Sequence, residues 1–282
     1  MNIYKKLNIF KENKLIIIML AAVLLNLVFS ILVPVVSNSN RVLFRIIAGI
    51  GLIIFVLFHG VKRYGWKKLL IFFAITSVIS WTMETLSIET VVPFGKYHYT
   101  DILGVKIGKV PLVIMPAYFF SGYLAWTMGT VFLGDLGKAI KKRNIFIIPF
   151  ISAFILVMWD YCFDPIMSTI YGLWIWEDGG AFYGVPLSNY YGWFITVYLI
   201  FQVFALFIYK FGDNNSLKQG KFYWSLVPLM FISLGSTYLV NPFFRTTNME
   251  IYSSMFLGTV FTMVFVSVLC LIFINRYYKN LK

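Results

Sequence analysis

The stretch "LIIIMLAAVLLNLVFSILVPVV" (residues 15–36) contains no charged side chain. A helix must present roughly 20 apolar residues to cross the ~30 Å hydrocarbon core of a bilayer, and this run is long enough to do so. It is too long for the core of a signal peptide, and no small-residue cleavage site follows it. We therefore expect a retained first membrane span, and this hydropathy indicates an integral membrane protein.

Similar runs recur along the chain, which is 60% hydrophobic and 12% charged and has a mean hydropathy of +0.82. No linker rich in Ser, Gly or Pro separates them, so we expect one transmembrane domain over residues 1–282. The prediction is an all-α, polytopic integral membrane helix bundle with about eight transmembrane helices, seven being the alternative count. The predicted spans are 15–36, 42–60, 69–91, 111–133, 145–164, 190–209, 222–240 and 251–275.

The net charge of +13 is distributed unevenly between the two sides of this predicted bundle. Of the 24 Lys and Arg residues, 18 fall in the terminal segments and in the loops at 61–68, 134–144 and 210–221. Basic residues in short loops remain cytoplasmic, so we expect a multi-pass protein of the cell membrane with both termini in the cytoplasm. The charge is thus a topology signal that also attracts anionic membrane lipid, and it indicates no nucleic-acid partner.

Three carboxylates are predicted inside the outer half of the bundle. In "MWDYCFDPIM" (158–167), Asp160 and Asp164 lie one helical turn apart at the outer end of a span. Glu84 lies about seven residues from the end of its span, which places it roughly 10 Å deep. A charge at that depth is costly and typically faces a protein-lined cavity. The alternative is structural: Asp164 would end its helix before Pro165, and Glu84 would be an interior hydrogen-bonding group.

Two predicted outer loops, 92–111 and 165–189, are long, rich in aromatic residues and interrupted by Gly and Pro. Aromatic side chains are typical of the membrane interface, so these loops could form an interfacial belt. They also border the carboxylates, so they could instead cover an apolar pocket. Both interpretations remain open, and they are compatible.

Two ordered motifs in this region resemble a known family. They are "ETLSIETVVPFGKYHYTDILGVKIGKVPL" (84–112) and "DPIMSTIYGLWIWEDGGAFYGVPLSNYYGW" (164–193), the second with D-P, W-x-W, Y-G-V-P-L and N-x-x-G-W in order. Together they resemble the signatures of the membrane carotenoid biosynthesis proteins, a family that includes bacterioruberin-pathway and γ-carotene hydratases. Ser87 and Val91 stand where glycines are expected, and Tyr118 stands near an expected tryptophan. These departures bear on which substrate is used more than on membership of the family.

The resemblance implies the addition of water to a terminal C=C bond of a long-chain isoprenoid or carotenoid, which gives a tertiary alcohol. Such a reaction needs an acid that protonates the alkene, and a carboxyl group in apolar surroundings can stay protonated. The candidate catalytic residues are Glu84, Asp160 and Asp164. Aromatic faces would stabilise a cation, and polar groups would position water. The candidate substrate-binding residues are Tyr97, Tyr99, Trp159, Trp174, Trp176, Asn189 and Trp193.

The sequence indicates neither a cofactor nor a metal. The chain has only two histidines, too few for a histidine-rich di-iron centre, and it has no G-x-G-x-x-G segment after a strand. Cys162 and Cys270 lack C-x-x-C spacing. We therefore expect the new hydroxyl to come from water. The expected partners are the isoprenoid or carotenoid substrate and membrane lipid, with other carotenoid-pathway enzymes as a further candidate.

Two other functions remain as alternatives. "WDYCFD" superficially resembles the aspartate-rich Mg²⁺ motif of an intramembrane prenyltransferase. Such an enzyme needs a second acidic motif and basic residues, and none of the residues between Arg143 and Lys210 is Lys or Arg. The second alternative is a non-enzymatic carrier of a lipid isoprenoid, which would keep a pocket and its aromatic residues but would not need the acids.

Overall fold

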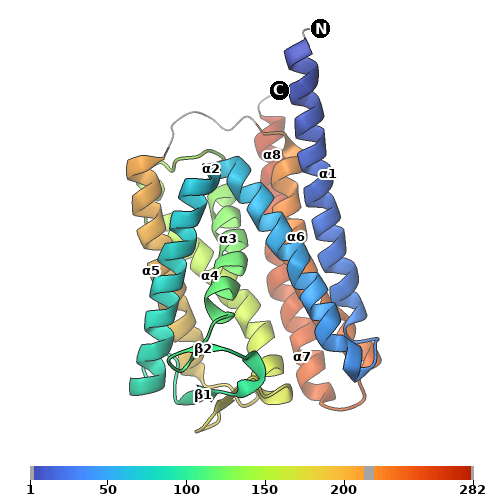
Figure 1. Ribbon diagram of the computed structural model, residues 1–282, viewed down its shortest axis with the longest axis vertical. Helices are drawn as coiled ribbons and strands as arrows, with labels where there is room; N and C mark the ends of the chain where they lie inside the picture. The colour runs from blue at the N-terminus through green and yellow to red at the C-terminus, as the bar shows by residue number, and fades with distance from the viewer. Residues whose placement is uncertain (1–2, 213–218, 281–282) are drawn as a thin grey trace.

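The computed structural model describes residues 3–212 and 219–280, which form a bundle of long helices with short strands gathered at one end (Figure 1). The longest helices are α1 (Ile3–Leu32), α2 (Asn38–Thr90), α5 (Leu187–Phe211) and α6 (Lys221–Phe244). Between them in the chain lie α3 (Ile114–Phe132) and α4 (Ile147–Asp164), and α4 continues into a π-helical turn, η3 (Pro165–Ile170). The last span combines α7 (Met249–Thr259), a π-helical turn (Val260–Val264) and α8 (Phe265–Lys279). The predicted all-α polytopic bundle is confirmed.

Six helical stretches within the described residues are long and apolar enough to cross a membrane. They cover Asn13–Leu32, Ser39–Thr90, Lys142–Ile170, Leu187–Phe211, Lys221–Phe244 and Met249–Lys279. The second stretch holds two arms, because Gly65 has a non-helical backbone conformation (φ 77°, ψ 159°) that only glycine adopts without strain. The predicted spans 42–60 and 69–91 are therefore the two arms of one kinked helix, which doubles back in Figure 1.

The helix α3 runs through the middle of the bundle and is not among the six stretches above. Most of its residues from Tyr118 to Val131 are buried against other helices. Surrounded by protein, such a helix can carry polar groups that lipid would not tolerate. One example is the indole Nε1 of Trp126, which donates a 2.9 Å hydrogen bond to the hydroxyl of Tyr64. Packing between Phe72 and Phe204, stacked at 4.0 Å, joins α2 to α5 beside it.

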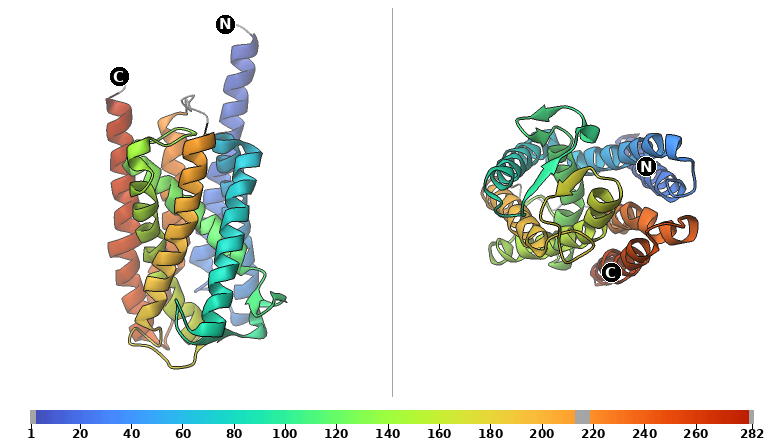
Figure 2. Two further views of the ribbon diagram at one scale, coloured as in Figure 1. Left: turned by 90° about the vertical axis from the view of Figure 1, so that its left-hand side faces the viewer. Right: turned by 90° about the horizontal axis from the view of Figure 1, so that it is seen from below.

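The beginning of α1 and the end of α8 lie at the same end of the bundle, opposite the strands (Figures 1 and 2). At the strand end, the two aromatic-rich loops pair with each other: β1 (Tyr97–Tyr99) runs antiparallel to β4 (Trp174–Trp176). A smaller hairpin joins β2 (Lys106–Ile107) to β3 (Val110–Pro111). The β1–β4 sheet lies over the ends of the helices that carry the carboxylates, and it completes the site described next.

Candidate functional site

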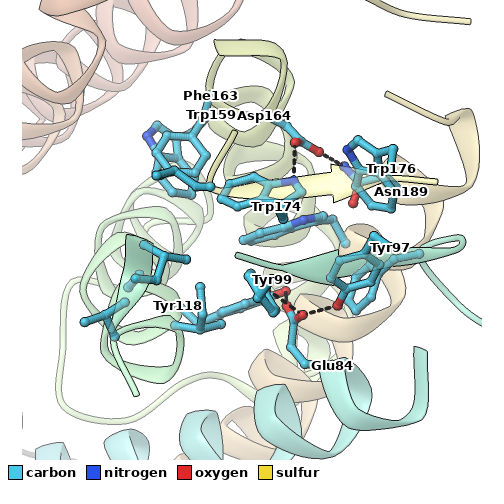
Figure 3. Close-up of a pocket in the computed structure, with 17 residues that line it drawn as sticks. Glu84, Tyr97, Tyr99, Tyr118, Trp159, Phe163, Asp164, Trp174, Trp176 and Asn189 are labelled. Atoms are coloured by element: carbon cyan, nitrogen blue, oxygen red, sulfur yellow. Dashed lines mark hydrogen bonds between the residues drawn. The ribbon is translucent and has the colours of Figure 1, made fainter. Parts of the chain in front are cut away.

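A cavity of about 180 Å³ lies beneath the β1–β4 sheet, between α2, α3, α4 and α5 (Figure 3). Its lining includes two of the three predicted catalytic residues and all seven predicted substrate-binding residues. Those lining residues are Glu84, Asp164, Tyr97, Tyr99, Trp159, Trp174, Trp176, Asn189 and Trp193. The remaining lining residues are mostly apolar: Phe94, Leu103, Val113, Ile114, Ala117, Tyr118, Phe163 and Leu173. Asp160 is buried but does not line the cavity.

Strand pairing explains why four aromatic side chains face this cavity. In the antiparallel register, Tyr97 lies opposite Trp176 and Tyr99 lies opposite Trp174. Side chains alternate between the two faces of a strand, so these four rings share the inner face. The residues between them, His98 and Ile175, are exposed on the outer face. The Y-x-Y and W-x-W patterns thus form one aromatic surface.

Glu84 is held at the cavity by three tyrosine hydroxyls from two different segments. Tyr97 and Tyr99 of β1 both donate hydrogen bonds to Oε2, the second at 2.8 Å, and Tyr118 of α3 donates to Oε1 at 2.8 Å. Burial raises the pKa of the Tyr97 and Tyr99 hydroxyls well above the usual value, and the charge of Glu84 raises it further. Both hydroxyls therefore keep their protons and act as donors. Each of the three hydroxyls donates to Glu84 and so stabilises its anion, which opposes the cost of burying a charge there.

Asp164 occupies the other side of the cavity and has a different set of donors. Figure 3 shows it above the ring of Trp174, with Glu84 below that ring in the same view. The indole Nε1 of Trp174 donates to Oδ1 at 2.8 Å, and the side-chain amide of Asn189 donates to Oδ2 at 2.5 Å. Asp164 is 1% exposed, so these two groups replace water as its hydrogen-bond partners.

Asp160 is connected to Asp164 through the same amide. Nδ2 of Asn189 also donates to Oδ2 of Asp160, at 3.2 Å. The two aspartates lie one turn apart on α4 and share this donor, so two full charges there would repel each other in an apolar setting. A single proton held by the pair relieves that repulsion. Asp160 does not line the cavity, so any effect that it has on a ligand there passes through Asp164 or Asn189.

Stacked rings form the rest of the wall. Tyr118 stacks on Trp193 at 4.3 Å with an interplanar angle of 4°, and Trp159 stacks on Phe163 at 4.4 Å. Trp159 and Trp193 also form a T-shaped pair, with ring centroids 6.1 Å apart and an interplanar angle of 73°. Ring faces attract cations, so a positive charge that develops in this cavity would be stabilised on several sides.

The glycine of the N-x-x-G-W motif allows α5 to approach the first loop closely. A Cβ atom at Gly192 would lie 2.6 Å from Cδ1 of Phe94 and 2.9 Å from the backbone of Pro93. No side chain can be accommodated there unless the loop moves. The motif therefore has a packing function: it lets the Asn189 end of α5 contact the loop that carries Tyr97.

Of the three departures from the family pattern, Tyr118 lines the cavity, and Ser87 and Val91 lie where α2 meets the first loop. Tyr118 supplies a hydroxyl to Glu84, which a tryptophan could not do in the same way. Oγ of Ser87 accepts a hydrogen bond from the backbone N–H of Phe94 at 3.1 Å, so it fastens the first loop to α2. Val91 ends α2 in the left-handed conformation (φ 72°), in which a β-branched residue is strained and glycine is not.

Sequence reasoning missed eight lining residues, and three of these, Tyr118, Phe94 and Phe163, are aromatic. Tyr118 had a signal, because it departs from the family pattern, but it lies outside both motifs and 34 residues from Glu84, so the sequence did not reveal their contact. Phe94 lies inside the first motif, and Phe163 directly precedes Asp164. Within the described residues, no group of three or more His, Cys, Asp or Glu side chains is placed to hold a metal ion.

Comparisons with known proteins agree with the motifs. The sequence profile of a family described as "Carotenoid biosynthesis protein" matches residues 41–269, well over half of the chain. The bisanhydrobacterioruberin hydratase of Haloarcula japonica is 30% identical over 146 residues. That match covers 51% of this chain and 45% of the relative, so it spans only about half of either protein. No solved structure gives a significant match.

Proposed function

The chain belongs to the carotenoid biosynthesis protein family, and on that premise we propose that it adds water to a terminal C=C bond of a long-chain isoprenoid or carotenoid and forms a tertiary alcohol. The observation that carries this proposal is the pair of carboxyl groups, Glu84 and Asp164, that face one aromatic cavity from different helices. The hydratase activity named for the Haloarcula relative supports the same reaction type.

The size of the cavity suits the end of an isoprenoid but not its full length. An apolar cavity of about 150 Å³ holds a molecule the size of benzene, so one of about 180 Å³ accommodates roughly one terminal prenyl group. The remainder of the substrate would leave the cavity past Val113, which lines it and is 51% exposed. Hydrocarbon emerging there would enter the lipid that surrounds the bundle.

The first step in this proposal is a proton transfer. Asp164 donates its proton to the less substituted carbon of the alkene, and the π electrons form the new C–H bond. A tertiary carbocation results, and the faces of Trp159, Trp174 and Trp193 stabilise it. Asp160 positions Asp164 through the Asn189 amide, which donates a hydrogen bond to each of the two carboxyl groups. General acid catalysis typically contributes ~10²–10⁴-fold to a rate, so the cavity would supply the rest by orientation and electrostatics.

The second step adds water to the cation. A lone pair of the water oxygen forms the new C–O bond, and a proton of that water passes to a carboxylate. Glu84 suits the acceptor role because three tyrosine hydroxyls stabilise its anion. Loss of this proton gives the neutral alcohol. The proton gained by Glu84 balances the proton given by Asp164, and exchange with solvent restores both groups.

Isosteric amides test these roles. We expect Glu84→Gln and Asp164→Asn to lower kcat by about 10²-fold or more with near-normal substrate binding, because the lost interaction belongs to the transition state. Glu89→Gln is the matched control, since Glu89 is on the same helix but pairs with Lys109 at the surface. Products are identified by mass analysis of pigments from a carotenoid-producing host and from the purified protein. Normal turnover in both folded variants would refute the acid–base assignment.

The same assay separates the alternatives. A carrier would bind the isoprenoid in both variants and in the wild type without forming alcohol. An Mg²⁺-dependent prenyltransferase would lose activity in EDTA and regain it with Mg²⁺, and its product would gain a prenyl group instead of one water.

We also propose that the beginning of α1 and the end of α8 face the cytoplasm, on the grounds of the basic-residue asymmetry. Cysteines introduced as Ala181→Cys and Lys142→Cys, both at exposed positions, lie at opposite ends of the bundle. The native Cys162 and Cys270 are buried and should react slowly. A membrane-impermeant maleimide added to intact cells should label position 181 and not position 142. The reverse labelling pattern would invert the topology.

A further inference from the structure

The basic residues at the strand end of the bundle fall into two groups. Each of the three lysines forms an ion pair with a carboxylate: Lys96 with Glu177 at 3.1 Å, Lys106 with Asp101 at 2.9 Å and Lys109 with Glu89 at 2.9 Å. The three arginines, Arg41, Arg45 and Arg245, pair with no carboxylate among the described residues. Even Glu250, the acidic residue nearest to Arg245 in sequence, forms no ion pair with it.

These arginines gather although they come from distant parts of the chain. Nε of Arg41 donates to the carbonyl of Val36 at 3.3 Å, and Nη2 of Arg245 donates to the carbonyl of Val33 at 3.4 Å. Both therefore lie at the turn between α1 and α2, which Figures 1 and 2 show beside the connection from α6 to α7. Arg41 is within electrostatic reach of both Arg45 and Arg245. Arg41 is therefore repelled by both of the other arginines, and an anion beside it would remove that repulsion.

Two orphaned polar atoms point to a ligand at the same place. Nε of Arg245 is buried and has no hydrogen-bond partner in the described part of the chain. The side chain of Asn241 is also buried, and its Oδ1 is unpartnered. Buried polar groups are normally satisfied, so each such exception needs an explanation. An acceptor atom of a ligand would satisfy Nε of Arg245, and a hydroxyl or other donor would satisfy Oδ1 of Asn241.

Beside the arginines lies a second cavity, of about 230 Å³, which is separate from the one that holds Glu84. Arg45 lines it, with its guanidinium 4.1 Å from the ring centre of Tyr171, and so does Asn241. Much of the remaining wall is apolar, including Leu52, Ile166 and Leu234. Asn26, Ser30 and Thr237 add further polar groups, but most of the wall is apolar. Trp159 and Phe163 line both cavities, so one stacked pair separates them.

We propose that Arg41, Arg45, Arg245 and this second cavity bind a phosphate-bearing membrane lipid, with its phosphate on the arginines and an acyl chain in the cavity. Guanidinium groups match the oxygens of phosphate and form strong, charge-assisted hydrogen bonds with them. A free phosphate ion would satisfy the arginines but would leave the apolar cavity unused. The site lies at one end of the spans, at the level where headgroups meet the hydrocarbon core. It does not depend on the proposed hydration.

The test compares lipids that share acyl chains and differ in the headgroup. Full-length protein is purified in neutral detergent, stripped of lipid and titrated with dioleoyl phosphatidylglycerol, dioleoylglycerol or inorganic phosphate. Binding is followed by native mass spectrometry and by the shift in Tm. We expect the phospholipid to bind at least about tenfold more tightly than dioleoylglycerol and to raise Tm more than inorganic phosphate does. Equal binding of the two lipids, or an equal shift with inorganic phosphate, would overturn the proposal.

Variants then test each half of the site. Arg41→Gln/Arg245→Gln should weaken phosphatidylglycerol binding about tenfold or more. Lys106→Gln/Lys109→Gln, which loses the same charge at the same end, should not. Gly49→Leu should also weaken it, because Gly49 lines the cavity and a Cβ there meets no atom within 4 Å. This change replaces glycine with a better helix former, so the fold should be preserved. Unchanged lipid binding in either the arginine variant or Gly49→Leu would refute the corresponding contact and with it the proposed site.

Discussion

The side-chain amide of Asn189 on α5 donates a 2.5 Å hydrogen bond to Asp164 on α4, and the same nitrogen reaches Asp160 at 3.2 Å. One amide from a neighbouring helix thus links both aspartates. Because both carboxyl groups are buried, their alternative partners are few. Asn189 lines the cavity, so a substitution there removes a hydrogen bond from both Asp164, the proposed acid, and Asp160.

Asn189→Ala should lower both stability and turnover. A buried group left without its hydrogen-bond partner costs about 1–3 kcal/mol, and in this variant two carboxyl groups lose the same donor. We expect a fall in Tm and a decrease in kcat of at least about tenfold. Gln202→Ala is the control, since Gln202 is an amide on the same helix that bonds to the carbonyl of Ile145 outside the cavity. Equal losses of kcat in the two variants would show that Asn189 has only a structural effect.

Tyr118→Phe should lower kcat by about tenfold and change KM little. The substitution removes one of three hydroxyl donors to Glu84, and a hydrogen bond to a charged group contributes roughly 1.5–3 kcal/mol. Stacking on Trp193 is preserved because the ring remains. Tyr123→Phe on the same helix removes a buried hydroxyl that contacts His59 instead. Steady-state kinetics of both variants distinguish the two sites, and a Tyr118→Phe enzyme with wild-type kcat would contradict the proposed role of Glu84 as proton acceptor.

Val91→Gly should stabilise the protein. Val91 has a φ of 72°, and a β-branched residue in that region carries strain of order 1–3 kcal/mol that glycine does not. Glycine also gains freedom in the unfolded chain, which offsets part of the benefit. We expect a net rise of about 1 kcal/mol, seen as a higher Tm. Val105→Gly, at an exposed loop position without a positive φ, should not raise Tm.

The ion pairs on the outer face of the sheet predict a modest dependence of stability on pH. Hydrogen bonds from Lys96 and then His98 hold the pKa of Glu177 below its usual range. A carboxyl whose pKa is lowered by folding stabilises the folded state above its unfolded pKa, near ~4.3 for Glu, and loses that contribution as pH falls through the folded value. The Tm difference between wild type and Glu177→Gln should therefore be small and positive at pH 7 and should shrink under acid conditions. A difference that grows on acidification would contradict this sign.

Local sequence signals were sufficient for much of the architecture. Each span is visible in its own residues, because a run such as 15–36 must be apolar throughout if lipid surrounds it. The i, i+4 spacing of Asp160 and Asp164 likewise places both on one side of α4. The two motifs pointed to five aromatic residues of the cavity, since each motif is continuous in the chain: Tyr97, Tyr99, Trp174, Trp176 and Trp193. What these signals share is that every contributing residue lies within one segment.

Tertiary structure alone decided which segments meet and which groups face the cavity. Tyr97 pairs with Trp176 across a separation of 79 residues, and Tyr118 reaches Glu84 from a third segment. Asp160 and Asp164 look equivalent in the sequence, but four residues of helix are a rise of about 6 Å, and only Asp164 lies at the level of the cavity. The arginine cluster likewise joins parts of the chain that are far apart in sequence. Hydropathy and periodicity describe one helix at a time, whereas these contacts depend on how the helices pack against one another, and that is a property of the whole chain.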